Sequence, residues 1–162
     1  MDAGNFGEVA AVTGHDRPLR PGGSGPAAYG AGVIERINPP VLARPSGFSH
    51  AVRASGTTVY LAGQTGTDAD GAIVHGGMVA QFEQALTNLL TALAAAGGAP
   101  DQLVRVTIYI ADVPAYRAAA AEIGAVWRRL AGRDYPAMAG IGVARLWDDD
   151  AVVEIEGIAV LP

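Results

Sequence analysis

The sequence contains neither cysteine nor lysine. Its 162 residues include no cysteine, and the 11 basic residues are all arginine. A chain without thiols or side-chain amines cannot form disulfides, cysteine-ligated zinc or iron–sulfur sites, or Schiff bases. Hydroxyls, carboxylates, arginine and three histidines remain as the groups that can carry chemistry.

Positive charge is also scarce. Only 17% of the residues are charged and the net charge is -5, which argues against a nucleic-acid partner. The histidines His15, His50 and His75 lie far apart and lack the spacing of a metal motif, so no metal site is predicted. The acidic run Asp148-Asp149-Asp150 is typical of a solvated turn.

Long hydrophobic runs and a basic leader are missing as well. No stretch reaches the ~20 apolar residues of a membrane span, and the first twelve residues do not resemble a secretory signal. We therefore expect a cytoplasmic protein without membrane contact. Residues 1–47 hold nine glycines and six prolines, so residues 1–31 are predicted to be a flexible arm and residues 32–162 one folded domain.

The hydrophobic patterns of the remaining chain alternate between strand and helix periods. They predict a short edge strand at 33–37, a hairpin of 51–54 with 57–63, a helix over 78–96, a strand over 103–111, a second helix between Asp112 and Gly132, and strands over 137–146 and 151–161. This order indicates an α+β fold, a mixed sheet with two helices packed on one face. An oligomer would hide the apolar part of the uncovered face.

Two glutamates on the last predicted strand are the strongest chemical signal. Glu154 and Glu156 lie two residues apart, so their side chains share one face of the strand. Such a pair can act in general acid/base catalysis, or it can simply mark a solvated face. A Ser49–His50 catalytic unit is disfavoured, because neighbours on a strand point to opposite faces.

Several ordered segments resemble the RidA family of enamine/imine deaminases, also called YjgF-like proteins. The similarity extends over about residues 33–162. The segments that carry it include Phe48-Ser49-His50-Ala51-Val52, Val59-Tyr60-Leu61-Ala62-Gly63-Gln64, Tyr135-Pro136-Ala137, Val143-Ala144-Arg145-Leu146 and Val153-Glu154-Ile155-Glu156-Gly157.

The resemblance implies a chorismate-mutase-like subunit that forms a homotrimer, with three ligand clefts between subunits. In deaminating members an arginine after the Pro-Ala pair binds the substrate carboxylate, and a backbone amide of the Ser-Gly-Gln segment assists it. A glutamate on the final strand positions the attacking water, and no cofactor is needed. By this resemblance Glu154 is the catalytic glutamate and Gly63 supplies the backbone amide.

Other positions depart from the family pattern. Met138 stands at the arginine position, and apolar or aromatic residues replace further polar or special ones. With Gly140 on the same predicted strand, the ligand-binding residues that the resemblance implies are Phe48, Ala62, Gly63, Ala120, Met138, Gly140 and Trp147.

These substitutions predict an apolar cleft in which Glu154 is the main ionisable group and acts as a general acid/base or positions the water. A 2-imino acid would bind poorly there, because the arginine partner of its carboxylate is missing. The first hypothesis is an enzyme that acts on a neutral imine, enamine or carbonyl compound. A binding protein without catalysis, and an ordinary 2-imino acid deaminase, remain as alternatives; nuclease action is disfavoured by the acidic charge.

Overall fold

The computed structural model describes residues 32–162, which form a mixed α+β fold, as predicted. The predicted arm at 1–31 and His15 lie outside the described residues. The elements in chain order are β1 (Ile34–Ile37), β2 (Ala51–Ala54), β3 (Thr57–Thr65), α1 (Gly77–Ala95), a 3-10 turn (Pro100–Gln102), β4 (Leu103–Ile110), α2 (Val113–Ala118), α3 (Ala120–Leu130), β5 (Ala137–Gly142) and β6 (Val153–Leu161).

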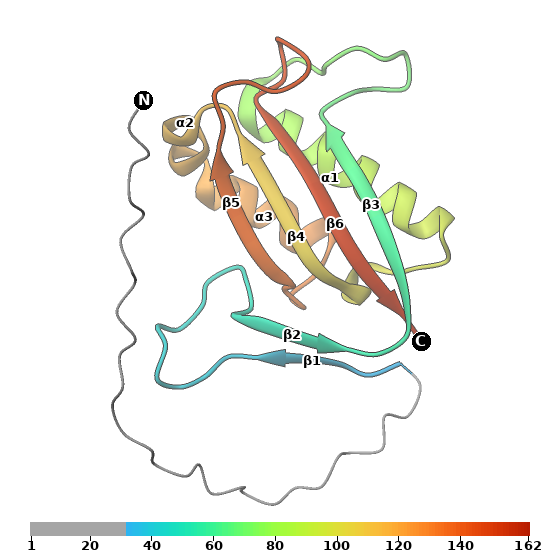
Figure 1. The fold of residues 1–162 in the computed structure, drawn as a ribbon. Coiled ribbons are helices and arrows are strands. Elements are labelled where there is room, and N and C mark those ends of the chain that lie inside the picture. The colour runs from blue at the N-terminus through green and yellow to red at the C-terminus, as the bar shows by residue number, and fades with distance from the viewer. Residues whose placement is uncertain (1–31) are drawn as a thin grey trace, which may run out of the picture.

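The main sheet has the strand order β3-β6-β4-β5 (Figure 1). The central strand β6 pairs antiparallel with both β3 and β4, whereas β4 and β5 run parallel. The long helices α1 and α3 lie behind one face of this sheet, and the other face carries no helix (Figure 1). The open face therefore belongs to the strands alone within the described residues.

The core lies between the helices and the sheet. Helix α1 contributes a stripe of fully buried residues at helical spacing, including Phe82, Leu86 and Leu89. They pack against the sheet, where Val153 and Ile155 of β6 are completely buried. Full burial of each such side chain contributes roughly 1.5–3 kcal/mol, so this layer supplies most of the hydrophobic stabilisation. None of the described helices is both long and apolar enough to span a membrane.

The predicted hairpin of 51–54 with 57–63 is wrong. Strand β2 pairs antiparallel with β1, from Ile34↔Ala54 to Ile37↔Ala51, and forms a separate two-stranded sheet. Strand β6 pairs with β3 instead. It has nine residues, whereas β2 has four, so it can form the longer ladder. At the connection Gly56 has φ 146°, and a Cβ there would lie 1.9 Å from the Leu161 carbonyl oxygen, so the chain can change sheets only with glycine at this point.

The second predicted helix is divided into α2 and α3. Asp112 caps α2 as expected, because its side chain accepts a hydrogen bond from the Ala115 backbone N–H. A single residue, Ala119, departs from helical geometry before α3 begins. The neighbouring residues are alanines, the best helix formers, so local propensity gives no sign of this break.

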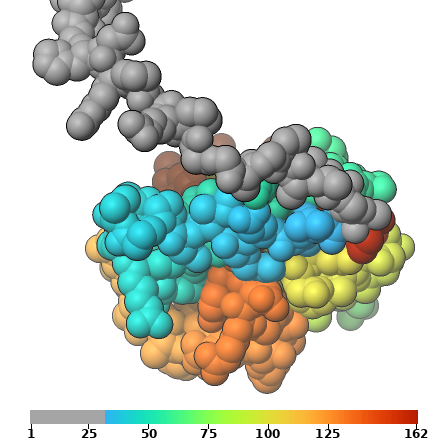
Figure 2. Space-filling view, turned by 90° about the horizontal axis from the view of Figure 1, so that it is seen from below, coloured from blue at the N-terminus to red at the C-terminus, as the bar shows by residue number. Residues whose placement is uncertain are grey.

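The β1–β2 sheet lies across one end of the molecule and is fastened to the segment before β5 (Figures 1 and 2). The Arg36 guanidinium donates to the carbonyl oxygens of Asp101 at 2.7 Å, Asp134 at 3.1 Å and Tyr135 at 3.2 Å. The Ser49 hydroxyl donates to the same Tyr135 carbonyl at 2.8 Å. The Arg36 bonds fasten β1 to the segment before β5 and to the 3-10 turn, and the Ser49 bond fastens the loop that precedes β2 to the same segment before β5.

Gln81 holds the chain where it enters β6. Its buried amide donates from Nε2 to the Asp150 carbonyl at 2.9 Å and accepts at Oε1 from the Val152 N–H at 2.8 Å. The Gln81→Leu variant would leave both backbone groups without a partner, at about 1–3 kcal/mol each. We expect urea denaturation to show a free energy of unfolding about 2–6 kcal/mol below wild type.

Gln84→Leu, on the same helix, is the matched control. The Gln84 amide donates only to the Asn88 side chain, so its loss should change the free energy of unfolding by less than about 1 kcal/mol. Equal destabilisation by the two variants would contradict the role given to Gln81.

Candidate active site

Glu154 lies on the open face of the sheet. Along β6 buried residues alternate with half-buried ones, and Glu154 and Glu156 occupy the half-buried positions between Val153, Ile155 and Gly157. The predicted shared face of the two glutamates is thus present in the structure. Val153 and Ile155 fix the side on which they project, since these two must face the helices.

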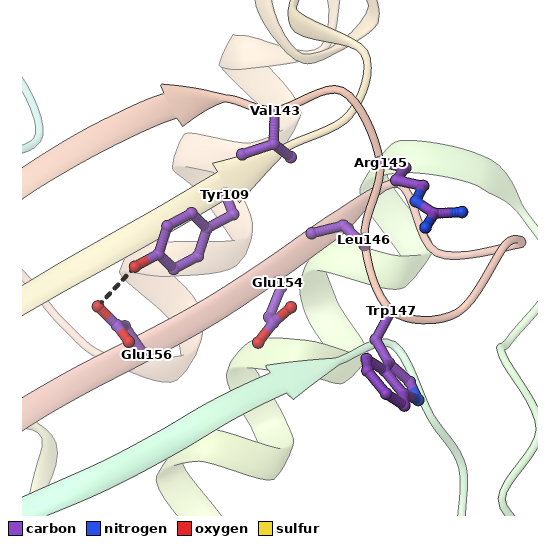
Figure 3. A pocket seen from close by; sticks show the side chains of 7 residues that line it. All are labelled: Tyr109, Val143, Arg145, Leu146, Trp147, Glu154 and Glu156. Carbon is purple, nitrogen blue, oxygen red and sulfur yellow. Dashed lines mark hydrogen bonds between the residues drawn. The ribbon is translucent and has the colours of Figure 1, made fainter.

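The two carboxylates have different surroundings. The Tyr109 hydroxyl of β4 donates a hydrogen bond to Glu156 Oε1 at 2.9 Å. The side chain of Glu154, which lies directly opposite Tyr109 in the strand pairing, makes no hydrogen bond or salt bridge with any residue in 32–162. Figure 3 shows both glutamates on the same strand, with the tyrosine ring reaching across to Glu156. Glu154 is therefore the carboxylate with free acceptor capacity.

Glu154 and Glu156 line an open pocket of about 610 Å³. Tyr109 forms one side, and Val143, Arg145, Leu146 and Trp147, in the loop after β5, form the other (Figure 3). Trp147 is 94% exposed, which leaves its indole free to stack on a ligand or on a neighbouring chain. This loop carries the one predicted ligand-binding tryptophan to the Glu154 pocket.

Gly63 lies against Glu154. The register between β3 and β6 shifts between Leu61 and Gln64, so Ala62 and Gly63 form a bulge without paired residues on β6. A Cβ built on Gly63 would lie 1.9 Å from Glu154 Oε1. Only glycine leaves the carboxylate in place, which brings together two of the residues that the resemblance selected.

Met138 and Ala120 line a different cavity, of about 570 Å³, between the sheet and α3. Met138 pairs with Val106, a core residue, whereas the next residue, Ala139, pairs with Thr107 and shares the face of Glu156. Met138 and Glu154 therefore lie on opposite faces of the sheet in one chain. The predicted cleft that contains both can form only from two copies.

The other predicted ligand-binding residues are divided between these regions. Gly140 follows Met138 on the helix-facing side of β5, where a Cβ would lie 3.5 Å from Ile110 Cδ1. Phe48 is half-buried, contacts the His50 ring edge-on and follows the loop residues that line the Met138 cavity. Ala62 lines a third pocket, near Glu156 and Arg105.

Tyr109 was not singled out by the sequence, although alternation on its strand placed it opposite the core face. Its contact with Glu156 depends on the register between β4 and β6, which the sequence pattern does not contain. Among the described residues no group of three His, Asp or Glu side chains is arranged to hold a metal ion.

Comparisons with known proteins agree on one family. The family model for Endoribonuclease L-PSP matches residues 41–161. The chain is similar to 2-iminobutanoate/2-iminopropanoate deaminase of Capra hircus, with 36% identity over 129 residues, 79% of this chain and 88% of the relative.

Solved structures give the same result. A protein of unknown function from the conserved Rid family, YyfB of Yersinia pestis, has 40% identity and a TM-score of 0.70, covering 79% of this chain and 98% of that one. RidA from the Antarctic bacterium Psychrobacter sp. has 33% identity and a TM-score of 0.57, covering 74% and 92%. The likeness extends over nearly the whole length of each relative.

The Tyr109–Glu156 pair makes a testable electrostatic prediction. The hydrogen bond to Glu156 raises the pKa of Tyr109 above its ordinary value, and desolvation and the charges of Glu156 and Glu154 raise it further, while Arg105 lowers it. In Glu156→Gln the acceptor loses its charge, so the pKa of Tyr109 should fall toward that of a free tyrosine. NMR titration of ring-labelled tyrosine measures this pKa, and Tyr109→Phe assigns the signal.

Proposed function

Because the chain belongs to the RidA (YjgF-like) family, the family that the Endoribonuclease L-PSP model describes, we propose that it hydrolyses a neutral imine or enamine at Glu154. The observation that carries this proposal is the Glu154 carboxylate, which is half-buried, free of hydrogen-bond partners among residues 32–162, and set beside a backbone bulge at Gly63. The deaminase name of the Capra hircus relative supports the same reaction class.

Glu154 has the chemistry that this reaction needs. A water held by the carboxylate adds to the imine carbon, and the carboxylate takes the proton that the water loses. The first proton passes to the nitrogen and gives a carbinolamine. The carboxylate then transfers the carbinolamine hydroxyl proton to the same nitrogen as the carbon–nitrogen bond breaks, so ammonia leaves and the carbon becomes a carbonyl. One water is consumed for each ammonia released. Gly63 lies in the bulge that has no paired residue on β6, and in this proposal its backbone amide donates to the substrate.

The cleft in this proposal lies between copies of the chain in a homotrimer. The opposite placement of Met138 and Glu154 supports this arrangement, because the Glu154 pocket of one copy can face the Met138 cavity of the next. The open sheet face also exposes large apolar side chains, Tyr60 at 79% and Ile141 at 42%, which an assembly would cover. Analytical ultracentrifugation reports the number of copies.

The substrate is proposed to be uncharged at its reacting end. Met138, a thioether, occupies the position that the family uses for a carboxylate-binding arginine. Small residues, Ala120 and Gly124, widen the same cavity on the helix side, so a bulkier ligand than a small 2-imino acid fits. An uncharged N-unsubstituted imine with an aryl or similarly bulky group on the imine carbon matches both features and can release ammonia.

Removal of the Glu154 carboxylate is the direct test. Glu154→Gln should lower kcat for hydrolysis of uncharged imines, generated in situ, by about 100-fold or more, the usual contribution of a general acid/base. Gly63→Ala, which displaces the carboxylate without removing it, should lower kcat less. Ammonia release measures the rate. The control is Glu35→Gln, a change on the remote strand β1.

Two results would decide between the alternatives. Hydrolysis that survives Glu154→Gln rules out the proposed chemistry. Ligand-induced thermal stabilisation by imines that are never turned over would instead indicate a protein that binds without catalysis.

Met138→Arg probes the substrate carboxylate. The half-buried position at the start of β5 faces the cavity, so an arginine there can pair with the carboxylate of a 2-imino acid. We expect kcat/KM for 2-imino acids to rise by about 10-fold or more, and that for uncharged imines to fall. Met138→Leu, which adds no charge, serves as the control. A wild-type enzyme that already prefers 2-imino acids would contradict the assignment.

A further inference from the structure

The cavity beside Met138 has features that the reaction at Glu154 does not use. It lies between the sheet, helix α3 and the loop before β2, and its volume of about 570 Å³ is that of a pocket for a small organic molecule. Four aromatic side chains, Phe82, Tyr116, Trp127 and Tyr135, contribute to its walls. Trp127 and Tyr135 stack with ring centroids 6.2 Å apart, and Phe82 meets Tyr116 edge-on. These walls favour a flat apolar body.

One cation stands at the exposed edge of this cavity. Ala120, Gly124 and Arg128 follow one another at intervals of four residues on α3, so they share one face of the helix. A Cβ added to Gly124 would lie 3.2 Å from Arg128 Nη1, so the guanidinium lies back over Gly124, toward Ala120. The glycine therefore makes room for the arginine head beside the cavity.

The Arg128 side chain has no anionic partner among residues 32–162. Its guanidinium forms no salt bridge or hydrogen bond with any of these residues, and none of the described lining residues is acidic. The next residue, Arg129, is paired with Glu83 of α1 at 2.7 Å. The two adjacent arginines therefore differ. Arg129 forms a salt bridge within the chain, whereas the Arg128 guanidinium is available to a ligand.

A second donor in the same cavity also lacks a partner. Trp127 is only 4% exposed, and its indole N–H is buried without a hydrogen-bond acceptor among the described residues. The N–H has almost no accessible surface, so the Trp127 ring serves as a wall of the cavity and its N–H does not reach a ligand there. Arg128 is therefore the only charged donor among the described lining residues.

We infer that this cavity binds the carboxylate end of an aryl or similarly flat apolar molecule, with Arg128 as the anion-binding residue. A single guanidinium suits a carboxylate, because its planar fork matches two oxygens of one group. Arg128 takes over, from the helix side, the anion recognition that Met138 cannot provide. The ligand carries its charge at the end of the molecule rather than on the carbon next to the imine.

This inference rests on the proposed function, which describes the reacting end of the ligand. It adds the chemistry of the opposite end, a carboxylate. The substrate class becomes an imine or enamine with a flat apolar body and a distant carboxylate. It remains uncharged at the carbon that water attacks, as Met138 requires.

Calorimetric titration of the full chain with phenylpropanoate and with phenylpropanamide tests the inference. The two probes share a shape and differ in charge. We expect the acid to bind about 10-fold tighter than the amide, the effect of a charge-assisted hydrogen bond, and this preference to decline at high salt. Arg128→Gln should abolish the preference, and Arg129→Gln, the matched control, should retain it.

Equal affinity for the two probes, an acid preference that survives Arg128→Gln, or failure of both probes to bind overturns the inference. Repeating the titration with Glu154→Gln separates it from the proposed function, because that variant keeps Arg128. An acid preference without any imine turnover by the wild type leaves this site standing and removes the proposed reaction. Turnover without an acid preference does the reverse.

Discussion

The alternation of buried and half-buried residues along β6 from Val153 to Ala159 is the constraint on which the site depends. Val153 and Ile155 have no exposed surface, because they fill the layer between the sheet and α1. Their burial commits Glu154 and Glu156 to the opposite face, and a slip of one residue would bury two carboxylates at prohibitive cost. β6 also pairs on both edges, so β3 and β4 hold it in register and bring Gly63 and Tyr109 to the glutamates.

The candidate site depends on a difference in hydrogen bonding between the two glutamates of β6. Glu156 receives the Tyr109 hydroxyl, whereas Glu154 has no partner in residues 32–162 and faces the bulge. The same contrast recurs on α3, where Arg129 is paired with Glu83 and Arg128 is not. In each pair one residue has a partner within the chain and its neighbour has none among the described residues. Charge patterns alone cannot separate such neighbours, because the difference is made by contacts across elements.

The sequence predicted the features that depend on local periodicity. The α1 stripe, the Asp112 cap and the shared face of Glu154 and Glu156 all follow from spacing within one element. The sequence did not predict features that depend on how one strand pairs with another. The partner of β2, the bulge at Gly63 and the face of Met138 relative to Glu154 depend on strand pairing, which involves residues far apart in the chain. The family resemblance named candidate site residues, and in one chain these line separate cavities.

The close approach of Gly63 and Glu154 also limits how this chain can evolve. Because a Cβ at position 63 would overlap the carboxylate at 154, the effects of substitutions at the two positions are not independent. A shorter residue at 154 opens space for a side chain at 63, whereas a side chain at 63 that comes first displaces the glutamate. The two positions are epistatic, and relatives with a larger residue at the first are expected to have lost the glutamate at the second.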